Sequence, residues 1–156
     1  MRYRTDAFDV WIYRRDEDAV RYLLLHTSQE KAERWFNGGR FWQIPSEFVN
    51  EQEALQDAAR RCLSEFGLLA ESLWAVEHTY TIYNHRYQEL QLILVLAAEV
   101  KGIPDVRLSW EHSECRWCTA AECESLLGFR GLIEGLNWTR RYVSEAKTEL
   151  PELRLA

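Results

Sequence analysis

Apolar residues recur through residues 51–66 with the spacing of a helix that buries one face. The members of this stripe are Leu55, Ala58, Ala59, Cys62, Leu63 and Phe66. This i, i+3, i+4, i+7 rhythm predicts an amphipathic helix, and Gly67 supplies a C-terminal stop. A short strand and a tight loop at Pro45 precede the helix. We expect the rest of the chain to be organised around residues 42–68.

Strand-like runs rich in aromatic and β-branched residues surround this helix. We expect strands over residues 7–13, 20–27, 41–44, 73–83, 89–100 and 110–117. The polar stretch 28–40 is expected to be a loop that ends in an Asn37-Gly38-Gly39 turn. Thr119 is placed to cap a short helix that ends near Leu127, and a last helix covers 132–145. Strands mixed with one inserted and one terminal helix favour an α/β/α sandwich around a mixed sheet.

Composition restricts the classes of protein to which the chain can belong. At 156 residues we expect a single domain, 1–156, with residues 147–156 as a loosely held tail. Lys and Arg total 19 against 25 Asp and Glu, a net charge of −6, which argues against a nucleic acid polymer as partner. No secretory h-region and no membrane-spanning run is found, and the four scattered cysteines are expected to be reduced thiols. These features predict a cytoplasmic protein without a membrane partner.

Within residues 42–68, the sequence WQIPSEFVNEQEALQDAARRCLSEFGL resembles the Nudix box. The pattern of that box is G-x5-E-x7-R-E-U-x-E-E-x-G-U, where U is a bulky aliphatic residue. The resemblance covers almost the whole chain, from residue 7 to about residue 145. The LLLHTS strand end, Trp42 three residues before Pro45, and the run VRLSWEHSECRW are most similar to the diadenosine tetraphosphate hydrolase branch. This implies a Nudix-type α/β/α sandwich that hydrolyses nucleoside diphosphates linked to another group, with Mg²⁺ or Mn²⁺ as cofactor.

The box can be aligned in two registers. When it is anchored at Pro45, the first glycine falls on Glu47, the first glutamate on Glu53 and the arginine on Arg61. The three helical glutamates then fall on Cys62, Glu65 and Phe66. Anchoring at Gly67 instead places the first glycine on Ser46, the first glutamate on Gln52 and the arginine on Arg60. The three helical glutamates then fall on Arg61, Ser64 and Glu65. Glu65 is the one acidic residue of the helical set that remains in either register.

The substitutions weaken the metal-binding chemistry that the resemblance implies. A thiol and a phenyl ring offer nothing to Mg²⁺, which prefers hard oxygen ligands, and Cys62 and Phe66 also belong to the apolar stripe. Glu65 is the best surviving ligand, with an i, i+4 ion pair to Arg61 as its structural alternative. Glu47 and Glu53 are the other candidate ligands. Arg61 is expected to organise the loop and the helix.

Two further groups of residues are candidates for the site. Glu111 and His112 resemble the Glu-His pair of the diadenosine tetraphosphate branch and would act as base and as charge stabiliser. Tyr80, Tyr83, His85, Arg86 and Tyr87 form an aromatic–basic cluster suited to nucleobase stacking and phosphate contact. The structural alternatives are a surface loop pair without a role and ordinary tyrosine cover of a sheet.

Two classes of function follow from these observations. The first is a hydrolase of nucleoside triphosphates or dinucleoside polyphosphates with weak or altered activity, which would use Glu65, Glu111 and His112. The second is an inactive nucleotide-binding or protein-interaction module that needs no metal. Seven Trp residues would also allow an exposed aromatic patch and hence a homodimer.

Overall fold

A mixed seven-stranded sheet forms the centre of the molecule in the computed structural model, which describes residues 1–156. Its main path runs β3-β2-β1-β6-β5, with β4 paired to β1 and β7 paired to β2. The strands are β1 (Arg2–Arg15), β2 (Val20–Thr27), β3 (Trp42–Gln43), β4 (Ser46–Phe48), β5 (Ser72–Asn84), β6 (Glu89–Glu99) and β7 (His112–Cys118). The pair β1–β6 is parallel, whereas the other strand pairs are antiparallel.

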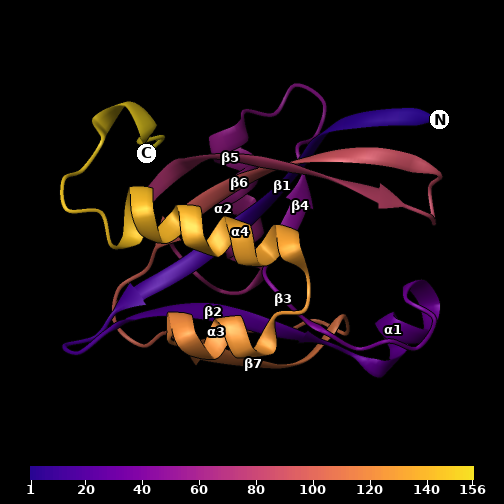
Figure 1. Cartoon of the computed structure of the whole chain (residues 1–156), viewed down its shortest axis with the longest axis horizontal. Coiled ribbons are helices and arrows are strands. Elements are labelled where there is room, and N and C mark those ends of the chain that lie inside the picture. The colour runs from indigo at the N-terminus through magenta and orange to yellow at the C-terminus, as the bar shows by residue number, and fades with distance from the viewer.

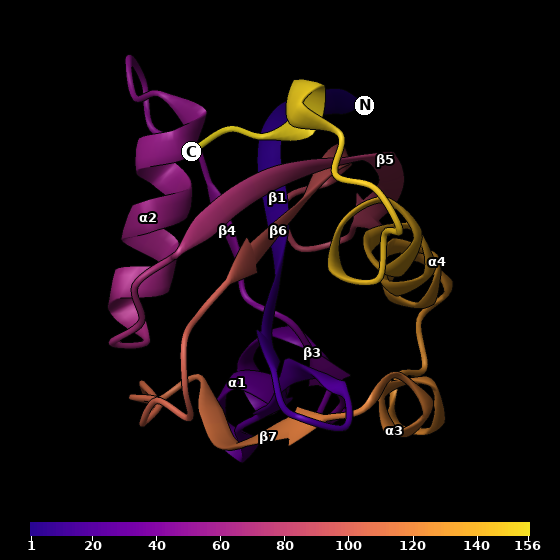
Figure 2. The same cartoon turned by 90° about the vertical axis from the view of Figure 1, so that its left-hand side faces the viewer.

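Helices cover both faces of this sheet. They are α1 (Gln29–Trp35), α2 (Leu55–Glu65), α3 (Ala120–Leu126) and α4 (Arg130–Thr139), with a π-helical turn at Arg140–Ser144 and a 3-10 turn at Pro151–Leu153. Figure 1 labels the four α-helices and the strands, and Figure 2 shows α2 on one side of the sheet and α4 on the other. The predicted α/β/α sandwich around a mixed sheet is therefore confirmed. No helix is both long enough and apolar enough to cross a membrane.

Two buried clusters result, because alternate residues of a strand point to opposite faces. Phe8 and Val10 of β1 pack with Cys62 and Leu63 of α2 on one face. Trp11 of β1 belongs to the second cluster, which contains residues of α3 and α4. The apolar stripe predicted for the central helix is the face that α2 buries.

Three local predictions are corrected by the structure. Residues 28–40 contain α1, because Ser28 accepts a hydrogen bond from the backbone N–H of Lys31 and so caps a helix there. Residues 46–48, expected to be loop, form β4 and pair with β1. Helix α2 begins at Leu55 and not near residue 51, after Gln52 adopts a left-handed conformation with φ of 64°.

The C-terminal residues, expected to be loosely held, pack against β5. The backbone N–H of Leu155 donates to the carbonyl oxygen of Leu73 at 2.8 Å, and the N–H of Leu73 donates to the carbonyl oxygen of Ala156 at 3.0 Å. Leu153 is buried, and the Arg154 guanidinium lies over the Trp74 ring at 5.5 Å. The tail is held because it covers the edge of β5, which would otherwise expose unpaired backbone groups.

Candidate functional site

A small cleft of about 50 Å³ lies where α1, the β3–β4 segment, the end of α2 and the start of β7 meet. Its lining consists of Lys31, Gln43, Ile44, Pro45, Ser46, Glu47, Glu65, Phe66, Glu111 and His112. The structure thus brings together Glu47, Glu65, Glu111 and His112, which the sequence placed in the candidate site. Three carboxylates face one ammonium group here, so the cleft has an excess of negative charge.

Arg61 holds the segment before α2 against the helix. It donates to both carboxylate oxygens of Glu53 and to the carbonyl oxygen of Phe48. Its Nη1 also lies 3.6 Å from Glu47 and 3.9 Å from Glu65. The Arg61 hydrogen bonds, with a further bond from the Asn50 backbone, hold the pKa of Glu53 below its usual range. Glu53 does not line the cleft and is bonded to the arginine.

When the box is anchored at Pro45, Cys62 and Phe66 occupy the positions at which the resemblance would place metal-binding glutamates. Cys62 is 1% exposed and lies in the core between α2 and the sheet. Phe66 is 8% exposed and packs in the same core, while one side of it lines the cleft, 6.1 Å from the His112 ring between centroids. Burial raises the pKa of the Cys62 thiol well above its ordinary value, so the group stays neutral.

Glu65 is the acidic residue that α2 presents to the cleft. Its side chain is 54% exposed. Partial burial raises its pKa above the ordinary value, and the nearby Glu47 and Glu111 carboxylates add to this effect, which the Arg61 charge opposes. A carboxylate whose pKa is raised towards neutrality is better suited to accept a proton than an unperturbed one.

Lys31 enters the cleft from α1. Its Nζ lies 3.3 Å from Glu111 Oε1, and its side chain is only 11% exposed. The neighbouring His112 Nε2 lies 2.7 Å from Gln43 Nε2, and its Nδ1 is buried without a hydrogen-bond partner. Burial and the Lys31 charge lower the pKa of His112 to about 4, so the imidazole is neutral at pH 7.

The residues of this cleft do not fit the metal site that the resemblance implies. Helix α2 supplies one carboxylate, and no group of three His, Cys, Asp or Glu side chains lies close enough together to hold a metal ion. Glu47 and Glu65 lie beside Arg61, and Glu111 lies beside Lys31. A metal ion would have to compete with these two cations for the same oxygens.

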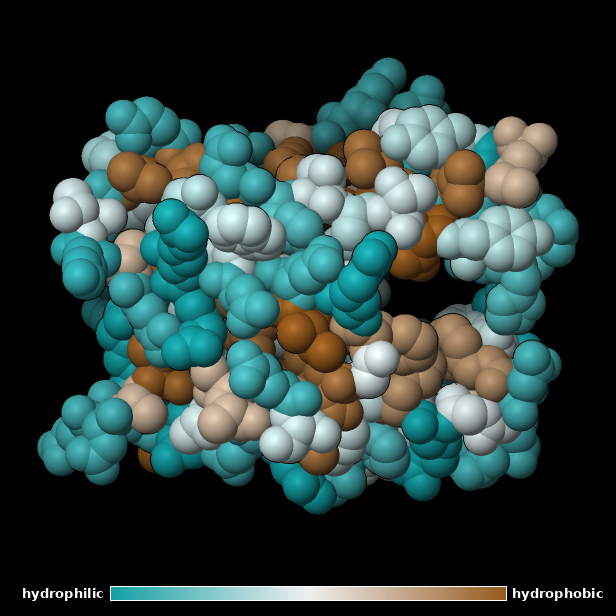
Figure 3. Space-filling view, viewed as in Figure 1, coloured by the Kyte–Doolittle hydropathy of each residue, from teal (hydrophilic) through white to brown (hydrophobic).

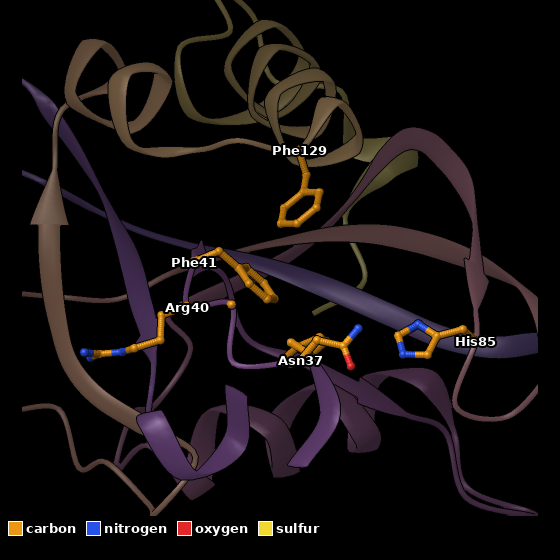
Figure 4. Close-up of a pocket in the computed structure, with 7 residues that line it drawn as sticks. Asn37, Arg40, Phe41, His85 and Phe129 are labelled. Carbon is orange, nitrogen blue, oxygen red and sulfur yellow. The ribbon is translucent and has the colours of Figure 1, made fainter. Parts of the chain in front are cut away.

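A second and larger cavity, of about 340 Å³, opens beside α1. It is lined by Phe36, Asn37, Gly39, Arg40, Phe41, His85 and Phe129. Figure 3 shows the hollow in the molecular surface, and Figure 4 shows Phe41 and Phe129 beside it with the Asn37 amide directed towards His85. The Arg40 side chain points away from the cavity in Figure 4, where it donates to Ser113 Oγ and to the Thr27 carbonyl oxygen.

The predicted aromatic–basic cluster is divided by the structure. Tyr80 lies under α4, where its hydroxyl donates to the Asp9 carboxylate and its ring lies against Gly131. Tyr83 is 48% exposed and donates to Gln88 Oε1. Arg86 stacks on the Trp35 ring at 4.3 Å and lies 5.1 Å from the Tyr87 ring. His85, from the same turn, is the residue of the cluster that lines the larger cavity.

Sequence reasoning missed Lys31 and the phenylalanine-walled cavity. The signal for Lys31 was Ser28 followed by QEKAERW, a capped stretch of good helix formers. The cavity is lined by three separate segments of the chain, namely residues 36–41 between α1 and β3, His85 in the turn between β5 and β6, and Phe129 before α4. No local pattern could have placed these segments side by side.

Comparison with known proteins agrees with the fold described above. The family model described as NUDIX domain matches residues 3–138. A search of curated proteins found no relative of significant similarity.

Solved structures share the fold at low sequence identity. A protein from Listeria monocytogenes described as a NUDIX hydrolase has a TM-score of 0.70 at 19% identity, covering 85% of this chain and 89% of that one. An Ap4A hydrolase from C. elegans, in a binary complex, has a TM-score of 0.66 at 21% identity, covering 88% and 94%. The NUDIX domain of NrtR from Shewanella oneidensis, complexed with ADP ribose, has a TM-score of 0.66 at 17% identity, covering 88% of each chain.

Proposed function

The chain belongs to the NUDIX domain family, and we propose that it binds nucleoside polyphosphates and hydrolyses them slowly. The substrate class is a nucleoside triphosphate or a dinucleoside polyphosphate, and structures of the same fold include an Ap4A hydrolase and a domain complexed with ADP ribose. The observation that carries the proposal is the position of Cys62 and Phe66, both buried in the core where the family pattern, anchored at Pro45, has glutamates. The fold is retained, but most of the helical acidic set is lost.

The residues that remain can still supply parts of the reaction. Glu65 and Glu111 face the cleft and are the two candidates to accept a proton from an attacking water. His112 is neutral at pH 7 and carries one N–H, which reaches a phosphate oxygen only if Nε2 leaves Gln43 or the buried Nδ1 turns into the cleft. Lys31 is the ammonium group placed to offset developing negative charge.

The charge of the cleft explains why turnover is expected to be slow. Glu47, Glu65 and Glu111 outnumber the two cations beside them, Lys31 and Arg61, so a phosphate chain approaches against net repulsion. Members of this family typically rely on divalent metal ions, and the carboxylates here do not form a set that would hold them. The remaining catalysis therefore has to come from positioning and from the weak acid–base groups named above.

A binding module without turnover is the second candidate. It is favoured by the pairing of Glu111 with Lys31 and of Glu47 and Glu65 with Arg61. A carboxylate that is already paired with a cation has fewer lone pairs free to accept a proton from an attacking water.

An assay for hydrolysis products distinguishes the hydrolase from the binding module. We would incubate the full chain with nucleoside triphosphates, nucleotide sugars and diadenosine polyphosphates, in Mg²⁺, in Mn²⁺ and in chelator, and compare it with Glu65→Gln and with Ser64→Ala, an exposed neighbour on α2. Slow turnover that is lost in Glu65→Gln and kept in Ser64→Ala supports the hydrolase. Saturable binding without turnover supports the binding module. The absence of both binding and turnover would exclude either function.

A further inference from the structure

The larger cavity has the chemical character of a site for a flat aromatic group. Phe36 and Phe41 meet edge to face at 4.8 Å, and Phe41 and Phe129 do so at 4.9 Å, with interplanar angles of 79° and 78°. Phe129 remains 51% exposed. Aromatic rings that gather at the rim of one cavity are typical of a site that contacts a ligand or a partner, because covering their apolar surface is favourable.

Polar groups lie on the side of the cavity away from Phe129. Asn37 adopts a left-handed backbone conformation with φ of 53° at the end of α1, and its amide is directed towards His85 across the hollow (Figure 4). An amide offers both donors and an acceptor, and an imidazole offers one or both kinds of group. Apolar walls with a few convergent polar groups are typical of small-molecule sites, and 340 Å³ lies at the small end of their range.

The position of the cavity beside the acidic cleft indicates which class of ligand the cavity would bind. Both are bordered by the segment from α1 to β3, because Lys31 and Gln43 line the cleft while Phe36 and Phe41 line the cavity. A ligand with a planar base at one end and phosphates at the other could reach from one to the other along this segment. The Arg86 guanidinium, fixed over Trp35 beside His85, adds positive charge at the cavity side.

We propose that this cavity is the nucleobase pocket of the chain, in which Phe41 and Phe129 contact the ring of the base and Asn37 reads its polar edge. The proposal rests on the nucleotide binding argued above and places the base away from Tyr80, which lies beneath α4 and is bonded to Asp9. Aromatic stacking tolerates every base, so the choice among bases depends on the Asn37 and His85 side of the pocket.

Titration calorimetry with AMP, GMP, CMP and UMP, and with ribose 5-phosphate as a probe that lacks a base, tests the pocket. We expect at least one monophosphate to bind at least tenfold more tightly than ribose 5-phosphate. Phe129→Ala should weaken the binding of that monophosphate about 5- to 100-fold and leave the affinity for ribose 5-phosphate unchanged. Leu69→Ala, which truncates a side chain 85% exposed in the loop after α2, is the matched control and should bind as the wild type does.

A second variant tests how the base edge is recognised without disturbing the backbone. Asn37→Asp keeps the shape and tolerates a left-handed conformation, but it replaces the amide donors by a negative charge. It should change the order of affinity among the four monophosphates. Asn37→Gly removes the side chain at a favourable φ and should make those affinities more nearly equal.

The outcomes separate this proposal from the proposed function. Equal affinity for ribose 5-phosphate and the monophosphates, no monophosphate binding at all, or an unchanged affinity in Phe129→Ala would each overturn the base pocket. Polyphosphate turnover that persists with an unaltered KM in Phe129→Ala would do so while leaving the hydrolase intact. Binding that depends on Phe129 without any turnover would support the pocket and exclude the hydrolase.

Discussion

Arg61 donates two hydrogen bonds to the Glu53 carboxylate, from Nε and from Nη2, each 3.0 Å long. A third bond runs 2.8 Å from Nη2 to the carbonyl oxygen of Phe48. The pair therefore joins the segment after β4 to the side of α2. Bidentate arginine–carboxylate bonds are among the stronger polar contacts in proteins, because both partners are charged and the geometry is fixed. The expected role of Arg61 as an organiser has this contact as its physical basis.

Arg61→Ala should lower the free energy of unfolding and loosen residues 49–54, because Glu53 and the Phe48 carbonyl lose their donor. The pKa of Glu53 is held below its ordinary value by these bonds. The stabilisation is therefore present above about pH 4.3 and is lost as the pH falls from there through the lower folded pKa. Urea denaturation at pH 7 and pH 3 measures both effects.

Arg60→Ala is the control for this change, since Arg60 pairs with Asp57 on the exposed side of α2. It should leave stability and pH dependence nearly unaltered. Equal stability of Arg61→Ala and Arg60→Ala at pH 7 would show that the bidentate pair contributes nothing to the fold.

Phe66→Glu restores an acidic residue of the family pattern as anchored at Pro45, yet we expect it to destabilise the chain. Phe66 is 8% exposed and packs with α2 against the sheet, so the substitution removes a large apolar side chain and buries a carboxylate. Removal of the ring alone costs about 3–5 kcal/mol. Urea denaturation should show a loss of at least this size, whereas Ser64→Glu, at an exposed position of the same helix, should be close to neutral. Unchanged stability together with new Mg²⁺ binding would contradict this expectation.

The amphipathic stripe predicted α2 and its buried face correctly because the pattern is local. The spacing of that stripe alone also identified Cys62 and Phe66 as apolar positions. The same kind of reasoning missed α1, since Gln29–Trp35 is a seven-residue helix with mostly polar residues that Ser28 caps. It could not show that Tyr80 would lie beneath Gly131 of α4, because that contact joins residues far apart in the chain. The cleft residues were therefore predicted in outline from two motifs, the box and the Glu111-His112 pair, whereas the cavity beside them depends on tertiary packing.

The titration of Asp9 should lower the free energy of unfolding as the pH rises towards neutrality. It is 5% exposed, and burial raises its pKa to about 7, although the Tyr80 hydroxyl opposes this. The folded state therefore holds the proton more tightly than the unfolded state. The stabilisation is complete below about pH 4 and is lost as the pH rises through about 7, with a size on the order of 4 kcal/mol.

Asp9→Asn removes this titration while keeping an acceptor for the Tyr80 hydroxyl. Urea denaturation at pH 5 and pH 8 should show a decline in the wild type that is much smaller in the variant. The difference between the two proteins cancels the titration of all other groups. Parallel declines would show that Asp9 is already ionised at pH 5.

Gly131→Ala should weaken both the fold and the proposed base pocket. A Cβ atom at this position would lie 2.5 Å from Cδ2 and Cε2 of Tyr80. The ring cannot easily withdraw, because its hydroxyl is bonded to the buried Asp9 carboxylate. The start of α4 must therefore move, and Phe129, two residues earlier, would move with it. We expect the free energy of unfolding to fall by about 1–3 kcal/mol, and we expect weaker monophosphate binding by calorimetry.

Gly128→Ala is the control, because it adds the same methyl group where no atom lies within 4 Å. It should be neutral or slightly stabilising. If the two alanine variants unfold at the same urea concentration and bind alike, the contact between α4 and Tyr80 does not position Phe129.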